Sequence, residues 1–283
     1  MLQVRSSDDV DVVVHELAGA AGSPLLLVAH ATGFHGCAYL PLAEYLAPPF
    51  QVFGMDFRGH GDTPQPAGID VDWGGYADDA IAVVDHLLTM PGGQDGIVGF
   101  GHSMGAASLL VAAARRPHAF RLIVVFEPIA HPPQTLAPGE GPASLIAGAR
   151  RRRRTFPSVE DAIANFSSKP PLNAFDPAAL DAYVRYGFRP EADGIHIKCD
   201  PEIEARTFEL GRLQHTWDAL SSVQVPVVVM SGKFAELQPS SFAEAVARQL
   251  PHGQFILEDE LDHFGPFTHP AGVAALVLEG GPR

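Results

Sequence analysis

The sequence contains very little cysteine. Cys37 and Cys199 are the only two in 283 residues, which excludes a disulfide-rich scaffold and favours free thiols over a disulfide. Neither a Cys-x-x-Cys nor a His-Glu-x-x-His pattern occurs, and the 13 histidines show no spacing typical of metal ligands. We therefore expect no structural or catalytic metal and no cofactor.

Positive charge and long apolar runs are also scarce. The chain has 19 Lys and Arg against 33 Asp and Glu, a formal net charge of −14, which disfavours nucleic acid and anionic membranes as partners. No apolar run approaches the length of a membrane span, and residues 1–14 lack the apolar stretch of a signal peptide. We expect a cytoplasmic protein that acts on a small, apolar molecule, as a monomer or a homodimer.

Apolar residues are plentiful by contrast, at 46% of the chain. A chain of this length can bury one large domain, or one domain with a smaller insert. Apolar runs typical of strands buried on both faces occur at residues 25–29, 50–55, 97–100, 122–126 and 225–230. Segments with a helical pattern separate these runs, so the sequence predicts an α/β fold with a mostly parallel, twisted sheet and helices on both faces.

The ends of the sheet and a central insert complete this outline. Residues 10–16 alternate polar and apolar, which indicates an edge strand, and residues 254–258 form the last strand. Residues 131–224 differ in character, because prolines at 132, 133, 138 and 142 are followed by short amphipathic segments without buried-strand patterns. We predict a core of residues 1–130 and 225–283 and a helical cap of residues 131–224 over the carboxyl edge of the sheet.

Arg150 to Arg154 form the one dense positive patch of the chain. Such a run is typical of the solvated face of a cap helix, where acidic segments such as Glu160-Asp161 could neutralise it. A role in holding an anionic substrate or partner is the alternative.

The sequence Gly101-His102-Ser103-Met104-Gly105 directly follows a buried strand and precedes an Ala/Leu-rich helix. Strand, sharp turn and helix are the context of a nucleophile elbow, in which the serine hydroxyl stands clear of the sheet. The flanking glycines remove Cβ atoms that would clash where strand and helix approach. Ser103 is therefore the candidate nucleophile.

A serine hydroxyl needs a neighbouring imidazole that takes its proton. His263 is the best candidate because it follows the last predicted strand, in a loop at the same edge of the sheet as the elbow. Four other histidines lie in loops at this edge: His30, His35, His60 and His102. His102 points away from its neighbour Ser103, and His30 fits a loop-bonding role better.

The base needs a carboxylate that fixes its tautomer, and two carboxylates compete. Glu127 ends the strand after the elbow helix, and Glu236 follows the next core strand. Either gives the chain order serine, acid, histidine.

Four motifs in this order resemble the α/β-hydrolase superfamily over essentially the full chain: residues 30–36, 56–61, 101–105 and 262–266. The resemblance implies an α/β-hydrolase fold with a nucleophile–histidine pair. It also implies an oxyanion hole formed by the backbone N–H groups of Thr32 and Met104. For the tight polar turn of residues 56–62, a structural loop with internal Asp/Arg pairing is the favoured interpretation.

The chain departs from the family pattern at the acid. Members usually carry Gly-x-x-Asp after the strand that corresponds to residues 225–230, and here Ala235 occupies the aspartate position. In certain haloalkane dehalogenases and in zearalenone-type lactone hydrolases the acid is a Glu 24 residues beyond the nucleophile, and Glu127 lies 24 residues beyond Ser103. This similarity favours Glu127 as the acid, with Glu236 as the alternative.

The type of nucleophile restricts the class of reaction. Dehalogenases and epoxide hydrolases of this superfamily use an aspartate, so Ser103 indicates acyl transfer through an acyl-enzyme. We predict a serine carboxylesterase or lactonase with the triad Ser103, His263 and Glu127. The alternatives are a carbon–carbon bond hydrolase or a cofactor-free perhydrolase with the same triad, and a non-catalytic ligand-binding receptor.

Overall fold

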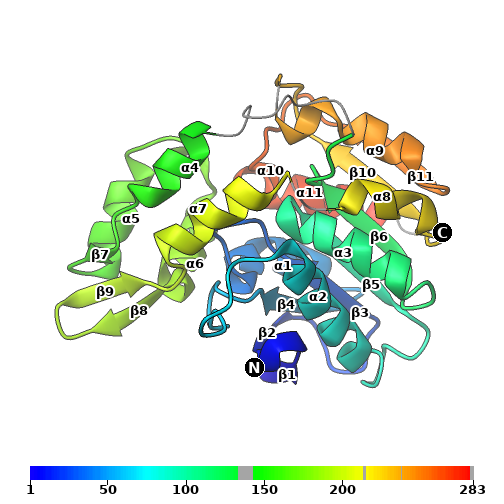
Figure 1. Ribbon diagram of the computed structural model, residues 1–283, viewed down its shortest axis with the longest axis horizontal. Helices are drawn as coiled ribbons and strands as arrows, with labels where there is room; N and C mark the ends of the chain where they lie inside the picture. Colours follow the sequence, from blue (N-terminus) through cyan, green and yellow to red (C-terminus); the bar gives the residue numbers. More distant parts are fainter. Residues whose placement is uncertain (133–142, 213–214, 237, 281–283) are drawn as a thin grey trace.

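An eight-stranded sheet forms the centre of the protein (Figure 1). The computed structural model describes residues 1–132, 143–212, 215–236 and 238–280. The strands of this sheet are β1 (Leu2–Arg5), β2 (Asp11–Ala18), β3 (Leu25–Ala29), β4 (Gln51–Asp56), β5 (Ile97–His102), β6 (Phe120–Phe126), β10 (Val227–Ser231) and β11 (Gly253–Leu257).

The spatial strand order is β1-β2-β4-β3-β5-β6-β10-β11. The strands from β4 to β11 run parallel, whereas β1 and β2 are antiparallel to their neighbours. The prediction that residues 10–16 form an edge strand was wrong, because β1 pairs with the outer side of β2. The predicted buried strands follow from their composition: all five residues of β3 and all five of β10 are buried.

Helices cover both faces of the sheet and create two hydrophobic cores (Figure 1). On one face pack α2 (Trp73–Leu87), α3 (Met104–Arg115), the short α8 (Thr216–Ala219) and α9 (Ala243–Gln249). On the other face pack α1 (Leu40–Leu46), α10 (Gly265–Thr268) and α11 (Pro270–Glu279). Cys37 and Cys199 are both buried and unpaired. Among the helices described, none combines the length and the apolar character that a membrane span requires.

The chain between β6 and α8, here named the insert, lies at one side of the sheet (Figure 1). It contains α4 (Ala143–Arg150), α5 (Val159–Ser167), α6 (Pro177–Gly187) and α7 (Pro201–Leu210). It also contains a three-stranded antiparallel sheet of β7 (Thr155–Phe156), β9 (Gly194–Ile197) and β8 (Phe188–Glu191). The expected insert was helical only, so this small sheet is a difference from the prediction. Of the four prolines that marked its start, only Pro132 belongs to the described residues.

Candidate active site

Ser103 lies in the sharp turn between β5 and α3. Its backbone angles are φ 57° and ψ −112°, a conformation that a non-glycine residue adopts only where its surroundings enforce it. A Cβ at Gly105 would lie 2.1 Å from the carbonyl oxygen of Ala29, and one at Gly101 would lie 2.5 Å from Cα of Ala106. Only glycine fits at these two positions. The two glycines of the motif therefore allow the sharp turn that places Ser103 beyond the end of β5.

Glu127 and His263 are directly hydrogen-bonded. The Nδ1 of His263 lies 2.6 Å from Oε2 of Glu127, and the carboxylate is almost fully buried whereas the ring is one quarter exposed. A buried carboxylate at this distance favours the tautomer in which Nδ1 carries the proton and Nε2 is left as an acceptor. This is the arrangement that the base and the acid of a catalytic triad require.

The other oxygen of Glu127 binds the loop after β10. The N–H of Gly232 donates to Oε1 at 3.0 Å, and the hydroxyl of Ser231 lies 3.4 Å from the same atom. The loop in which the family pattern places the acid thus donates a hydrogen bond to a carboxylate from the neighbouring strand. Glu236 is exposed to solvent.

His102 links three loops of this region. Its Nε2 lies 2.8 Å from the carbonyl oxygen of His263 and its Nδ1 lies 2.8 Å from the hydroxyl of Tyr39. Because a carbonyl only accepts, Nε2 donates and Nδ1 accepts the hydroxyl proton. The hydroxyl of Tyr39 in turn accepts from the N–H of Ala31 at 3.1 Å. This network joins the 30–36 loop, the elbow and the His263 loop.

The remaining candidate histidines, His30, His35 and His60, are buried, and each contacts a backbone carbonyl oxygen. His30 contacts the carbonyl oxygen of Ala31 through Nδ1 and accepts the N–H of Phe57 through Nε2. Burial, together with the neighbouring His60, lowers the pKa of His30 to about 3, and burial also lowers the pKa of His60, of His35 and, most strongly, of His102. These four rings are neutral at physiological pH.

A cavity of about 800 Å³ lies between the core and the insert, and both Ser103 and His263 line it. Thr32, whose N–H is one predicted oxyanion donor, lines the same cavity. Met104, the other predicted donor, is the first residue of α3, and the N–H groups of a first helical turn have no intrahelical acceptor. The cavity therefore brings a hydroxyl, an imidazole and the 30–36 loop to one space.

Aromatic side chains from several segments line the cavity: Phe34, Trp73, Phe166, Tyr183, Phe208, Phe242 and Phe264. Five other aromatic residues do not line it: Phe156, Phe175 and Phe188, which are buried in the core, Trp217, which packs against it, and Tyr186, which is exposed. The lining residues come from distant segments, so no local pattern could have grouped them.

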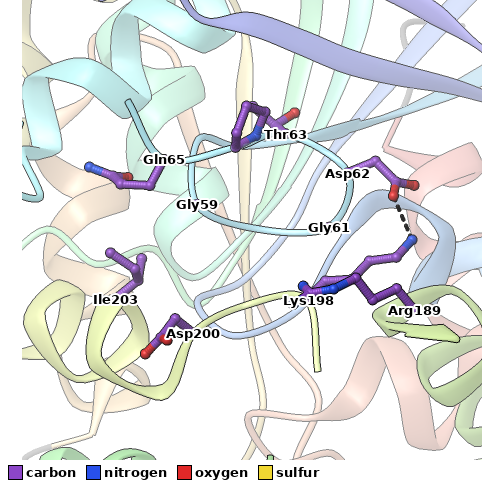
Figure 2. A pocket seen from close by; sticks show the side chains of 10 residues that line it. Gly59, Gly61, Asp62, Thr63, Gln65, Arg189, Lys198, Asp200 and Ile203 are labelled. Carbon is purple, nitrogen blue, oxygen red and sulfur yellow. Dashed lines mark ion pairs between the residues drawn. The ribbon is translucent and has the colours of Figure 1, made fainter. Parts of the chain in front are cut away.

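The 56–61 motif makes other ion pairs than those expected. Arg58 pairs with Asp8 and Asp79, and Asp56 hydrogen-bonds His15, so pairing within the turn was a wrong prediction. Asp62 instead pairs with Lys198 of the insert at 2.6 Å across a second cavity of about 310 Å³ (Figure 2). This small cavity holds none of the three candidate triad residues.

Within the described residues, two groups of side chains bring potential metal ligands together. One is His15, Asp56 and Asp62, and the other is Glu191, Asp193 and His196. The ligand atoms of the first group are already engaged by the hydrogen bond of His15 and by Lys198. Neither group lines the cavity that contains Ser103 and His263.

A mostly parallel eight-stranded sheet with a serine elbow, a histidine and an acid at its carboxyl edge defines the class. A sequence model of the Alpha/beta hydrolase family matches residues 25–276, so the chain belongs to that family. The predicted fold is thereby confirmed, and the protein is a hydrolase of this family.

Individual relatives cover nearly the whole chain. It is 25% identical to the pimeloyl-[acyl-carrier protein] methyl ester esterase of Xanthomonas campestris pv. campestris, over 95% of this chain and 96% of the relative. It is 24% identical to the 2-(acetamidomethylene)succinate hydrolase of Mesorhizobium japonicum, over 90% and 87%. A crystal structure of an E-2-(acetamidomethylene)succinate hydrolase superposes with a TM-score of 0.81 at 22% identity, over 98% and 97%.

Proposed function

We propose that the protein is a serine hydrolase that cleaves a carboxylic ester through an acyl-enzyme, with Ser103 as nucleophile, His263 as base and Glu127 as orienting acid. The observation that carries this proposal is the hydrogen bond of 2.6 Å between His263 and Glu127, at the edge of a cavity that also contains Ser103. Esters and related acyl derivatives are the substrates that such a constellation activates.

Each residue has a defined step. Nε2 of His263 takes the proton of the Ser103 hydroxyl as its oxygen bonds to the substrate carbonyl carbon. The N–H groups of Thr32 and Met104 stabilise the oxyanion, and preorganised donors of this kind contribute about 3 kcal/mol each. His263 then protonates the leaving group, and a water molecule activated by the same ring releases the acid. Glu127 stabilises the transient imidazolium throughout.

The relatives' names bear on the bond that is cleaved. The Xanthomonas relative is named a methyl ester esterase, which favours ester hydrolysis. The Mesorhizobium relative is named a hydrolase of 2-(acetamidomethylene)succinate, which favours cleavage of a carbon–nitrogen acyl bond as the second candidate. A lactone is an internal ester and enters by the same chemistry.

The proposal is tested by intact-protein mass after reaction with a fluorophosphonate, in parallel on the wild type and Ser103→Ala. We expect one adduct on the wild type and none on the variant, because only an activated serine attacks the probe. Ser108→Ala is the matched control, since Ser108 lies on α3 and its hydroxyl donates to the carbonyl of Met104. An adduct that persists in folded Ser103→Ala would contradict the assignment of the nucleophile.

A further inference from the structure

The cavity that contains Ser103 has the opposite charge to the protein as a whole. The chain carries a formal net charge of −14. Among the described residues that line the cavity, four are Lys or Arg and one is a carboxylate: Arg151, Arg152, Lys169, Arg212 and Glu204. A cationic cavity with low-dielectric walls in an acidic protein concentrates anions locally.

The ion pairs of the five-arginine run, Arg150 to Arg154, show which of these positive charges are already compensated by a carboxylate. Three of them form ion pairs with carboxylates at the start of α7: Arg150 with Glu202, Arg152 with Glu204 and Arg154 with Asp200. A fourth, Arg153, stacks on the ring of Phe156 at 4.4 Å. The three ion pairs involve every second residue of the run and attach the end of α4 to α7.

Arg151 is the member of the run that differs. It lines the cavity, and it makes no ion pair with a carboxylate of the described residues. Lys169 lines the cavity as well, and its Nζ donates to the amide oxygen of Asn165 at 2.8 Å. An amide leaves the positive charge of the ammonium uncompensated, so both cations remain free to bind an anion.

Apolar side chains line the same cavity as these two cations, which are themselves exposed. Phe34, Leu172 and Phe264 line the same cavity as Arg151. A ligand that matches this lining has an apolar body and a carboxylate at one end. The reacting acyl carbon lies at Ser103, so the carboxylate is a second group of the same substrate.

We propose that the preferred substrate is anionic: an ester or related acyl derivative that carries an additional carboxylate, held by Arg151 with Lys169. This inference rests on the proposed function, of which it specifies the substrate class. It differs from the expectation of an apolar substrate, and it assigns to Arg151 the anion-holding role that the sequence left as the alternative for the whole run.

The test compares two esters of equal shape, mono-p-nitrophenyl adipate and p-nitrophenyl 6-methylheptanoate. In the second, a neutral isopropyl group replaces the carboxylate. We expect Arg151→Gln to lower kcat/KM for the adipate ester by about tenfold, because a charge-assisted contact is lost. The neutral ester should change by less than about twofold.

Arg153→Gln is the matched control, since it removes one positive charge from the same run without altering the cavity lining. We expect this variant to leave the ratio of the two kcat/KM values unchanged. Equal losses on both esters with Arg151→Gln, or no loss on either, would overturn the anion subsite. If Arg153→Gln and Arg151→Gln changed this ratio equally, the effect would come from long-range electrostatics alone, and this result would also overturn the anion subsite.

A binding measurement separates this inference from the proposed function. If the wild type hydrolyses neither ester, ester hydrolysis fails as a function. Calorimetric titration with adipate still decides the subsite, because binding needs no catalysis. We expect Kd for adipate to rise about tenfold in Arg151→Gln, and an unchanged Kd would refute the subsite alone.

Discussion

Ser103 and Glu127 share an uncommon backbone geometry. They follow His102 and Phe126, which are directly paired in the register of β5 and β6, and their φ values are 57° and 45°. Because φ is positive at both positions, the chain turns sharply directly after β5 and directly after β6. Hydrogen bonds from the two backbone N–H groups stabilise these turns. The N–H of Ser103 donates to Phe126 and the N–H of Glu127 donates to Met230.

The identity of the acid leads to a prediction at this scale. In Glu127→Gln, the amide oxygen can replace Oε1 toward the N–H of Gly232, which turns the NH₂ group toward Nδ1 of His263. The ring must then carry its proton on Nε2, where it cannot accept from serine. We expect kcat to fall by about 10³-fold or more, as for loss of the correct tautomer in other triads.

The control for this prediction is Glu236→Gln. Its side chain is exposed, so kcat should stay within about twofold of the wild type. Hydrolysis of an activated ester, followed with both variants at matched thermal stability, provides the measurement. A large loss in Glu236→Gln with near-normal Glu127→Gln would transfer the acid role to Glu236.

At the scale of elements, the network from Ala31 through Tyr39 and His102 to His263 holds three loops in register. Both Tyr39 and His102 are fully buried, and burial raises the pKa of the Tyr39 hydroxyl far above its usual range, so that it stays protonated and donates to His102. The network thus connects the 30–36 loop with His263 through groups that do not titrate at physiological pH.

Tyr39→Phe tests this role. It leaves the N–H of Ala31 and Nδ1 of His102 without partners, which costs about 1–3 kcal/mol of unfolding free energy. Because Thr32 and His263 are attached to the network, we expect kcat to fall with little change in KM. Tyr76→Phe is the control, since it also removes a buried hydroxyl, one bonded to Thr207 of α7. Equal kcat values for the two variants would show that Tyr39 only stabilises the fold.

The sequence predicted the buried strands and the elbow because their signals are local and strong. It missed β1 and the sheet of β7, β8 and β9 because these strands have two to four residues, of which only one in each strand is buried, so they carry no apolar run. It misassigned the partners of Arg58, since Asp8 and Asp79 are 50 and 21 residues away. Contacts between distant segments leave no trace in local composition.

The candidate site was less predictable from the sequence than the buried strands. Glu127 competed with Glu236 until the fold placed one beside His263 and the other in solvent. The role proposed for Arg151 could not be predicted from the sequence, because the five arginines are identical and differ only in the residues that each of them contacts in the folded chain.

At the scale of the whole molecule, the pair His15–Asp56 predicts how stability depends on pH. Burial disfavours protonated His15, but the hydrogen bond to Asp56 outweighs it and raises the pKa of His15 to about 10. A group whose pKa is higher in the folded state stabilises the fold fully below its unfolded pKa of about 6.5, and this contribution disappears as the pH rises through 10.

We therefore expect the unfolding free energy of the wild type to decrease between pH 7 and pH 10, and that of His15→Gln to decrease less. Urea unfolding at several pH values measures both slopes, and the difference between them isolates His15 from other groups that titrate. Parallel slopes would show that His15 is neutral in the folded protein and that its bond to Asp56 is an uncharged one.

The alternation of partners along the arginine run has a consequence for how the cavity acquires its charge. Arg150 ends α4, the N–H of Arg151 still donates to the carbonyl oxygens of Ala147 and Gly148, and residues 152–154 have no helical structure. The point at which the helix ends therefore decides which arginine has no carboxylate of α7 opposite it. Deleting one residue between Ala149 and Arg154 would shift the arginines by one position against these carboxylates while leaving the composition almost unchanged, so that the spacing of the segment, more than its charge, sets which arginine is available to an anion.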